Sequence, residues 1–136
     1  MKSIEYRLAT PGDAAALASV GDELFDFPIK PQRLQEFLAD ERHHLLLACV
    51  DECVVGMASA FHYIHPDKNP AMFINEVSVL EEYRNQGIAR TLVRELVNYG
   101  RGLECKDFWV ATEHSNVAAR KAYRAAGFIE DAEPVV

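Results

Sequence analysis

Polar and hydrophobic residues alternate near the start of the chain, over Ile4 to Leu8, and this alternation predicts a strand. The next segment, Thr10-Pro11-Gly12-Asp13, offers a capping side chain, a proline suited to the first helical turn and an acidic residue, so a helix should begin there. From Pro31 to Ala39 the apolar residues recur at helical spacing, which predicts a second helix. The chain is therefore expected to open with a strand and two helices.

The middle of the chain is rich in apolar and β-branched residues. His44 to Val50 has the composition of a buried strand, Asp51-Glu52 forms a tight connection, and Cys53 to Tyr63 predicts a second strand, so this region reads as a hairpin. Prolines and turn-forming residues between His65 and Pro70 indicate a loop, and Met72 to Leu80 predicts the next strand.

After Gly87 the hydrophobic period becomes helical. The apolar positions that define this amphipathic helix are Ile88, Leu92, Val93, Leu96 and Val97. A short strand is predicted over Phe108 to Ala111, and a helix over Asn116 to Ala126, stopped by the glycine that follows it. A last strand is expected to begin at Phe128.

The predicted order of elements is thus β-α-α-β-β-β-α-β-α-β. A hairpin and meander followed by crossovers indicates an α/β (α+β) fold, with a mixed central β-sheet flanked by helices. Repeats and linkers are absent, so residues 1–136 are expected to form a single domain. Because few residues follow Phe128, the last strand should be truncated, missing or supplied by a partner subunit.

Composition narrows the classes of partner. The formal net charge of −7, from 21 acidic and 14 basic residues, disfavours nucleic acid and anionic membranes. Such a charge would attract a cationic substrate, but it is also an ordinary feature of a soluble surface. The three cysteines, Cys49, Cys53 and Cys105, are odd in number and are interpreted as core thiols in a reducing compartment. With no secretory signal at Met1 to Glu5 and no membrane-spanning run, the expected location is cytoplasmic.

The strand-to-helix junction from Val77 to Ala89 has the features of an anion site. A strand ends, a loop with Gly87 follows, and a helix opens at once with backbone N–H groups that lack partners. Arg84 is expected to add positive charge. The spacing fits neither a Walker loop nor a dinucleotide-binding fingerprint. Taken alone, Arg84 to Ala89 is equally compatible with an ordinary helix start beside a solvated arginine.

Two segments together resemble a known family. Asn75-Glu76-Val77-Ser78-Val79 through Tyr83-Arg84-Asn85-Gln86-Gly87-Ile88-Ala89 resembles motif A of the GCN5-related N-acetyltransferases (GNAT), and Asn116 through Tyr123 to Gly127-Phe128 resembles their motif B. The predicted order of elements also resembles the GNAT fold over nearly the whole chain. The region before motif A, with Phe37-Leu38-Ala39-Asp40 and the residues from His62 to Pro66, is most similar to the branch that includes aminoglycoside 3-N-acetyltransferases.

The resemblance implies acetyl-CoA as co-substrate and no metal. Backbone groups of Val77, Ser78 and Val79 would pair with the pantetheine arm as another strand would. Asn116 and Tyr123 on the second motif would contact the coenzyme. The pyrophosphate would be held by the backbone amides of a loop whose residues are Arg84, Asn85, Gln86, Gly87, Ile88, Ala89 and Arg90.

Two residues are candidates for catalysis. Tyr123 occupies the position of the family's general acid, where a phenol can protonate the departing thiolate. By its spacing alone, the reading as a core aromatic residue is favoured. Glu76 is an acid within an apolar strand, so it should face a wet cleft, where it could accept an ammonium proton or anchor the amine. Its alternative is a structural ion pair or a solvent-facing residue.

The histidines do not predict a metal site. His62 and His65 are three residues apart on an extended chain, so they point to opposite sides, and no cysteine lies nearby. They are placed instead in a loop that contacts the acceptor. His43, His44 and His114 are interpreted as surface or capping residues.

The sequence therefore predicts an acetyl-CoA-dependent N-acetyltransferase that transfers acetyl to a primary amine of a small cationic substrate, directly, in a ternary complex. The alternatives are a protein or peptide N-acetyltransferase and a non-catalytic acyl-CoA-binding regulatory module. The expected partner is a small-molecule amine, with neither nucleic acid nor membrane, and a homodimer is the assembly considered.

Overall fold

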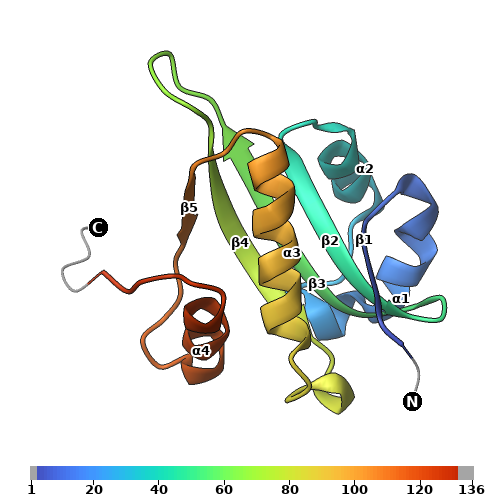
Figure 1. Ribbon diagram of the computed structural model, residues 1–136. Coiled ribbons are helices and arrows are strands. Elements are labelled where there is room, and N and C mark those ends of the chain that lie inside the picture. The colour runs from blue at the N-terminus through green and yellow to red at the C-terminus, as the bar shows by residue number, and fades with distance from the viewer. Residues whose placement is uncertain (1–2, 132–136) are drawn as a thin grey trace.

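The computed structural model describes residues 3–131, in which five strands form a single sheet in the order β1-β2-β3-β4-β5 (Figure 1). The first four strands pair antiparallel, and β5 pairs parallel with β4, which confirms the predicted mixed sheet. The strands are β1 (Glu5–Leu8), β2 (His43–Val50), β3 (Cys53–Tyr63), β4 (Ala71–Val79) and β5 (Asp107–Val110).

Helices cover both faces of this sheet. In Figure 1, α3 crosses one face with α4 beside it, and α1 and α2 lie on the opposite face. These helices are α1 (Ala14–Leu24), α2 (Pro31–Ala39), α3 (Ile88–Gly102) and α4 (Val117–Ala125), with short 3₁₀ turns at Pro11–Asp13 and Glu81–Tyr83. The observed bounds agree closely with the predicted ones, because the hydrophobic period marks which residues must face the sheet.

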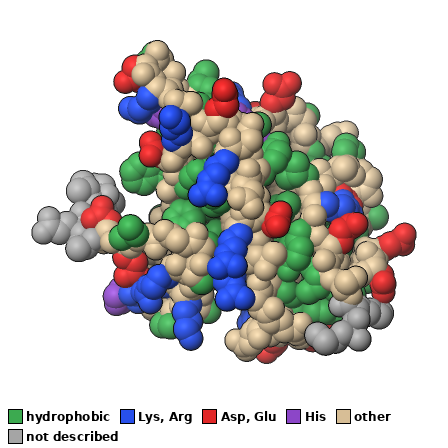
Figure 2. Space-filling view, in the orientation of Figure 1, with side chains coloured by type: hydrophobic (Ala, Val, Ile, Leu, Met, Phe, Trp, Pro, Cys, Tyr) green, Lys and Arg blue, Asp and Glu red, His purple; other side chains and the backbone are tan. Residues whose placement is uncertain are grey.

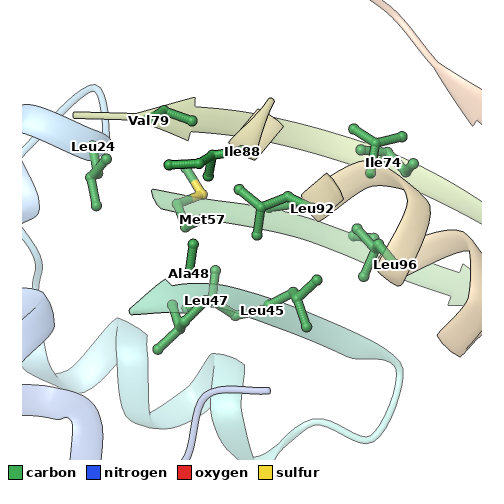
Figure 3. Packing of buried hydrophobic residues seen from close by; sticks show 14 of the residues in the cluster. Leu24, Leu45, Leu47, Ala48, Met57, Ile74, Val79, Ile88, Leu92 and Leu96 are labelled. Atoms are coloured by element: carbon green, nitrogen blue, oxygen red, sulfur yellow. The ribbon is translucent and has the colours of Figure 1, made fainter. Parts of the chain in front are cut away.

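The core between α3 and the sheet depends on a close crossing. Ile88, Leu92 and Leu96 project from α3 toward the strands (Figure 3), and all three are buried. A Cβ atom on Gly56 of β3 would lie 3.3 Å from side-chain atoms of both Ile88 and Leu92. Glycine at this position therefore lets the first turns of α3 settle directly on the sheet, which fixes where the helix begins.

A partly buried ion pair ties β1 to the start of α1. The Arg7 guanidinium donates to both carboxylate oxygens of Asp13, at 2.8 and 2.6 Å, and the backbone amide of Thr10 donates to Asp13 at 2.7 Å. Asp13 is 7% exposed. The acid predicted to help start this helix thus also anchors the first strand.

Two expectations from the sequence are wrong, and the last predicted strand is missing from the described residues, which is one of the alternatives left open for it. The described residues after Gly127 form no strand, because the Phe128 amide bonds to the carbonyl of Tyr123 and Glu130 pairs with Arg120, holding this segment against α4. The rest of the predicted last strand, residues 132–136, lies outside the described residues. Cys53 is exposed at the hairpin rather than a core thiol. His44 is buried rather than on the surface.

Within residues 3–131, no helix has both the length and the apolar character needed to cross a bilayer. In the same part of the chain, no three His, Cys, Asp or Glu side chains are grouped so as to hold a metal ion.

Candidate active site

The sheet opens between β4 and β5. The parallel pairing of these strands covers Ala71 to Ile74 on β4 and ends with Ile74 opposite Val110. Beyond that point, the edge of β4 from Asn75 to Val79 has no partner strand among the described residues, although its other edge remains paired with β3. The predicted edge groups of Val77, Ser78 and Val79 therefore lie where an extended ligand could hydrogen-bond to them.

The loop that follows β4 forms a concave set of backbone amides. Asn85 has φ of 63° and Gly87, the N-cap of α3, has φ of 80°, so two left-handed residues turn the chain sharply before the helix. Among the described residues, no backbone carbonyl accepts a hydrogen bond from the amides of Ile88, Ala89 and Arg90, the first N–H groups of the helix. A nest of this kind, combined with the positive end of the α3 dipole, suits a phosphate or pyrophosphate.

Arginines around the loop have two different roles. The Nε atom of Arg84 donates to the carbonyl of Val79 at 3.1 Å, which braces the loop against the end of β4. The guanidinium of Arg90 lies over Gly87, where a Cβ atom would come within 3.2 Å of it. Figure 2 shows further Lys and Arg side chains gathered over α3 and α4 on this face. Although the chain is acidic overall, this face suits an anionic ligand.

A separate cleft of about 400 Å³ lies on the face of the sheet that carries α1 and α2. Its floor includes Leu45, Ser59 and Glu76 from neighbouring strands, and Asn75 lies beside them. The connection between α1 and α2 forms its wall. The wall and helix residues that line the cleft are Phe25, Asp26, Phe27, Pro28, Ile29, Lys30, Arg33, Leu34 and Phe37.

A β-bulge aims two polar side chains into this cleft. Ser59 pairs with Glu76 but the next residue, Ala60, pairs with Ile74, which leaves Asn75 as an extra residue on β4. Neighbouring residues on a regular strand point to opposite faces, and the bulge lets Asn75 and Glu76 share one face instead. The predicted wet cleft around Glu76 is therefore present.

The carboxyl of Glu76 is half-buried, and burial raises its pKa, with a smaller contribution from the nearby carboxylate of Asp26. A raised pKa brings a carboxylate closer to the value that a general base needs at neutral pH. The sequence reasoning missed Asp26. The only available signal was its position between two aromatic residues, Phe25 and Phe27, the second of which is 74% exposed.

The second motif places its residues on α4. Asn116 is the N-cap, and its Oδ1 accepts a hydrogen bond from the amide of Ala119 at 3.1 Å. Tyr123 is buried beside α3, with its ring edge-on to Phe128 at a centroid distance of 6.0 Å. Burial raises the pKa of the Tyr123 phenol, so it remains protonated at neutral pH and can donate.

The candidate residues thus divide between the two faces of the sheet. Glu76 lines the cleft on the face covered by α1 and α2. Tyr123 is not part of the cleft lining and lies on the face covered by α3. The opening between β4 and β5 separates them. The proposed loop contact of His62 with an acceptor is wrong, because His62 lies on β3 and bonds to His44, whose ring contacts Tyr99 of α3 on the opposite face.

Comparisons with known proteins identify the family of this chain. Residues 14–128 match the acetyltransferase (GNAT) family. An aminoglycoside N(6′)-acetyltransferase type 1 from Stenotrophomonas maltophilia is 31% identical over 136 residues, covering 96% of this chain and 88% of the relative. The expected similarity to the 3-N-acetyltransferase branch is therefore wrong, because the region before motif A is too short to distinguish the branches.

Solved structures agree on the fold. An aminoglycoside N-acetyltransferase in complex with CoA superposes with a TM-score of 0.84 at 21% identity, covering 100% of this chain and 93% of that chain. The same enzyme in complex with a bisubstrate analogue, CoA-S-monomethyl-acetylneamine, gives 0.82 at 22% identity, with 98% and 95% covered. A ribosomal-protein-alanine N-acetyltransferase from Brucella melitensis biovar Abortus 2308 gives 0.79 at 19% identity, with 98% of both chains covered.

These likenesses confirm the predicted GNAT fold, and the family match confirms the predicted class of enzyme and its co-substrate, acetyl-CoA. The two motifs located from the sequence coincide in the structure with a helix-start nest and an opened sheet edge. The chain belongs to the acetyltransferase (GNAT) family.

Proposed function

We propose that the protein transfers an acetyl group from acetyl-CoA directly to a primary amine that is bound in the cleft at Glu76. The observation that supports this best is the opening between β4 and β5, which lies between the amide nest on one side and the cleft on the other. A pantetheine arm paired along Val77 to Val79 would reach from the nest toward that opening. Donor and acceptor could then be bound together, as a ternary mechanism requires.

Glu76 and Tyr123 have complementary roles in this proposal. The amine must lose a proton before it attacks the thioester carbonyl, and the raised pKa of Glu76 suits it to receive that proton directly or through water. The C–S bond then breaks, and the protonated phenol of Tyr123 donates to the thiolate that leaves. The thioester is replaced by an amide and a free thiol.

Aminoglycosides are the acceptor class that we propose first, because the matched relative is named for acetylating them. Their several ammonium groups can pair with the carboxylates of Asp26 and Glu76, which line the cleft together with the cationic side chains of Lys30 and Arg33. The direct transfer itself is supported by the bisubstrate analogue bound to the structural neighbour. A cytoplasmic location, a single domain and a homodimer stay predictions.

The test is release of free thiol from acetyl-CoA in the presence of aminoglycosides, simple amines and a peptide with a free N-terminal alanine. Tyr123→Phe should lower kcat roughly 100-fold or more and change the KM for acetyl-CoA little, and Glu76→Gln should lower kcat/KM for the amine by a similar factor. An unchanged turnover in Tyr123→Phe would refute its assignment. A wild-type protein that binds acetyl-CoA but releases no thiol with any amine would be a non-catalytic binding module.

A further inference from the structure

A row of aromatic side chains crosses the sheet on the face that carries the acceptor cleft. One residue comes from each of four strands, and neighbours are paired in register: His43 with Phe61, Phe61 with Phe73, and Phe73 with Trp109. Residues directly opposite on adjacent strands point to the same face. Ring centroids are 5.7 Å apart for His43 and Phe61, and 5.5 Å apart for Phe61 and Phe73. We call these four residues the aromatic row.

The aromatic row borders the cleft directly. Ser59 on the cleft floor lies two residues before Phe61 on β3, so the two side chains share a face and are about 7 Å apart along the strand. The ring of Phe37, which lines the cleft, is 5.3 Å from that of His43. A ligand in the cleft could therefore extend over the row without leaving the surface.

The row is open to solvent, unlike the other face of the same strands. Met72 and Ile74, which flank Phe73 on β4, point toward α3 and are fully buried. Phe61 and Phe73 are only half-buried, and Trp109 is 55% exposed. Contiguous exposed rings of this size are uncommon on a monomer surface and mark binding sites.

The chemistry of the row favours an ammonium group. Asp107 lies two residues before Trp109 on β5, so its carboxylate shares the face of the indole ring. Asp107 is exposed, and no residue between 3 and 131 forms an ion pair with it. Aromatic faces beside a carboxylate attract a cation through the ring quadrupole and through charge.

The spacing matches an extended acceptor. Glu76 pairs with Ser59 and Phe73 pairs with Phe61, so with the bulge Glu76 lies about 7 Å from Phe73 along the strand, and Trp109 lies one strand further, about 5 Å across. We propose that the aromatic row and Asp107 form a second subsite, which binds a distal ammonium group of a polyamine acceptor while Glu76 binds the reacting amine. This inference rests on the proposed function. Its occupant is the acceptor, because the row continues the cleft and Asp107 beside it carries the complementary charge.

The test compares two acceptors with the same reacting ring. Kanamycin A carries several ammonium groups, and 6-amino-6-deoxyglucose offers a like primary amine without the distal ones. Trp109→Ala and Asp107→Asn should each raise the KM for kanamycin A roughly 2- to 30-fold, with little change in the KM values for the single-ring amine and for acetyl-CoA. Trp109→Phe should restore most of the affinity, since it keeps an aromatic face.

The control is Ile64→Ala, which removes another exposed apolar side chain, 70% exposed, outside the row. It should leave both acceptors unaffected. Equal changes in the KM values for the two acceptors, or no change in the KM for kanamycin A, would overturn the second subsite while leaving the proposed function intact. Sedimentation that shows a dimer lost in Trp109→Ala would assign the row to a second copy of the chain and overturn the proposal. Absence of turnover by the wild type with every amine would refute both.

Discussion

Acidification should destabilise this protein in a window set by one buried histidine. His44 on β2 is 6% exposed, and its Nε2 atom lies 2.7 Å from Nδ1 of His62, with the two rings stacked. Burial, together with repulsion from the nearby His62 and His43, lowers the pKa of His44 to about 4, against a weaker opposing effect of Asp40. A hydrogen bond between two imidazole nitrogens needs one proton, so a second proton between them would be repelled.

The size and sign of this pH effect on stability follow from the difference in proton binding between the folded and unfolded chains. Between pH 6.5 and about 4 the unfolded chain binds a proton at His44 and the folded chain does not, so stability falls as the pH falls through that range. Each unit of pKa difference corresponds to about 1.4 kcal/mol, which makes the full loss about 3 kcal/mol by pH 4. Above pH 7 this residue should add no pH dependence.

Urea unfolding followed by circular dichroism, at constant ionic strength and at half-unit steps from pH 7.5 to 4, measures this loss. His44→Gln keeps a polar side chain without a titrating one, so the stability lost between pH 6.5 and 4 should be about 3 kcal/mol smaller in the variant. Imidazole NMR signals of the folded wild type should show His44 neutral at pH 5. Parallel stability curves for the two proteins, or a His44 signal that titrates near pH 6.5, would refute the reasoning.

Three further substitutions test other parts of the structure. Gly100→Ala should lower the free energy of unfolding by about 1–3 kcal/mol, because the new Cβ atom would lie 2.6 Å from the Phe108 ring; Gly102→Ala, with no atom within 4 Å of its Cβ position, is the control and should not destabilise. Gly87→Ala should lower the free energy of unfolding by about 1 kcal/mol, because the φ of 80° is unfavourable for alanine, and should raise the KM for acetyl-CoA in steady-state kinetics. An unchanged KM would show that the loop does not bind acetyl-CoA. Asp13→Asn should lower the free energy of unfolding by about 2 kcal/mol at pH 7. Because the pKa of Asp13 is lowered to about 2, its contribution is lost as the pH falls from 3.8 through about 2, and the difference from the wild type should shrink over that range. A difference that persists at about pH 2 would contradict this prediction.

The sequence predicted the strand-to-helix junction on the proposed donor side because that junction depends on backbone geometry with a strong local signal. The glycine that caps α3 and the helical period after it fix where unpaired amides occur. The left-handed conformation of Asn85 was not foreseen, because its side chain tolerates several conformations and only the neighbouring loop selects this one.

The acceptor side was less predictable because it depends on contacts between distant segments. An acid in an apolar strand indicated that Glu76 faces a cleft, but the wall comes from the connection between α1 and α2, about fifty residues away in the chain. The burial of His44 was missed for the same reason, since its partner on β3 has no signature in the local sequence. The last segment was expected to be a strand because Phe128 favours one, and ion pairs from Glu130 to α4 override that preference.

The bulge at Asn75 connects the two halves of the site. Without the extra residue, strand alternation would turn Glu76 toward α3, away from the cleft, because Ile74 already faces that side. With it, Glu76 enters the cleft while Val77 to Val79 keep their pairing with β3 and leave the opposite edge free. The bulge comes directly after the last residue of β4 that pairs with β5. The place where the sheet opens is therefore also the place where the Glu76 carboxylate changes face, so one irregularity in β4 would serve both the proposed donor site and the proposed acceptor site.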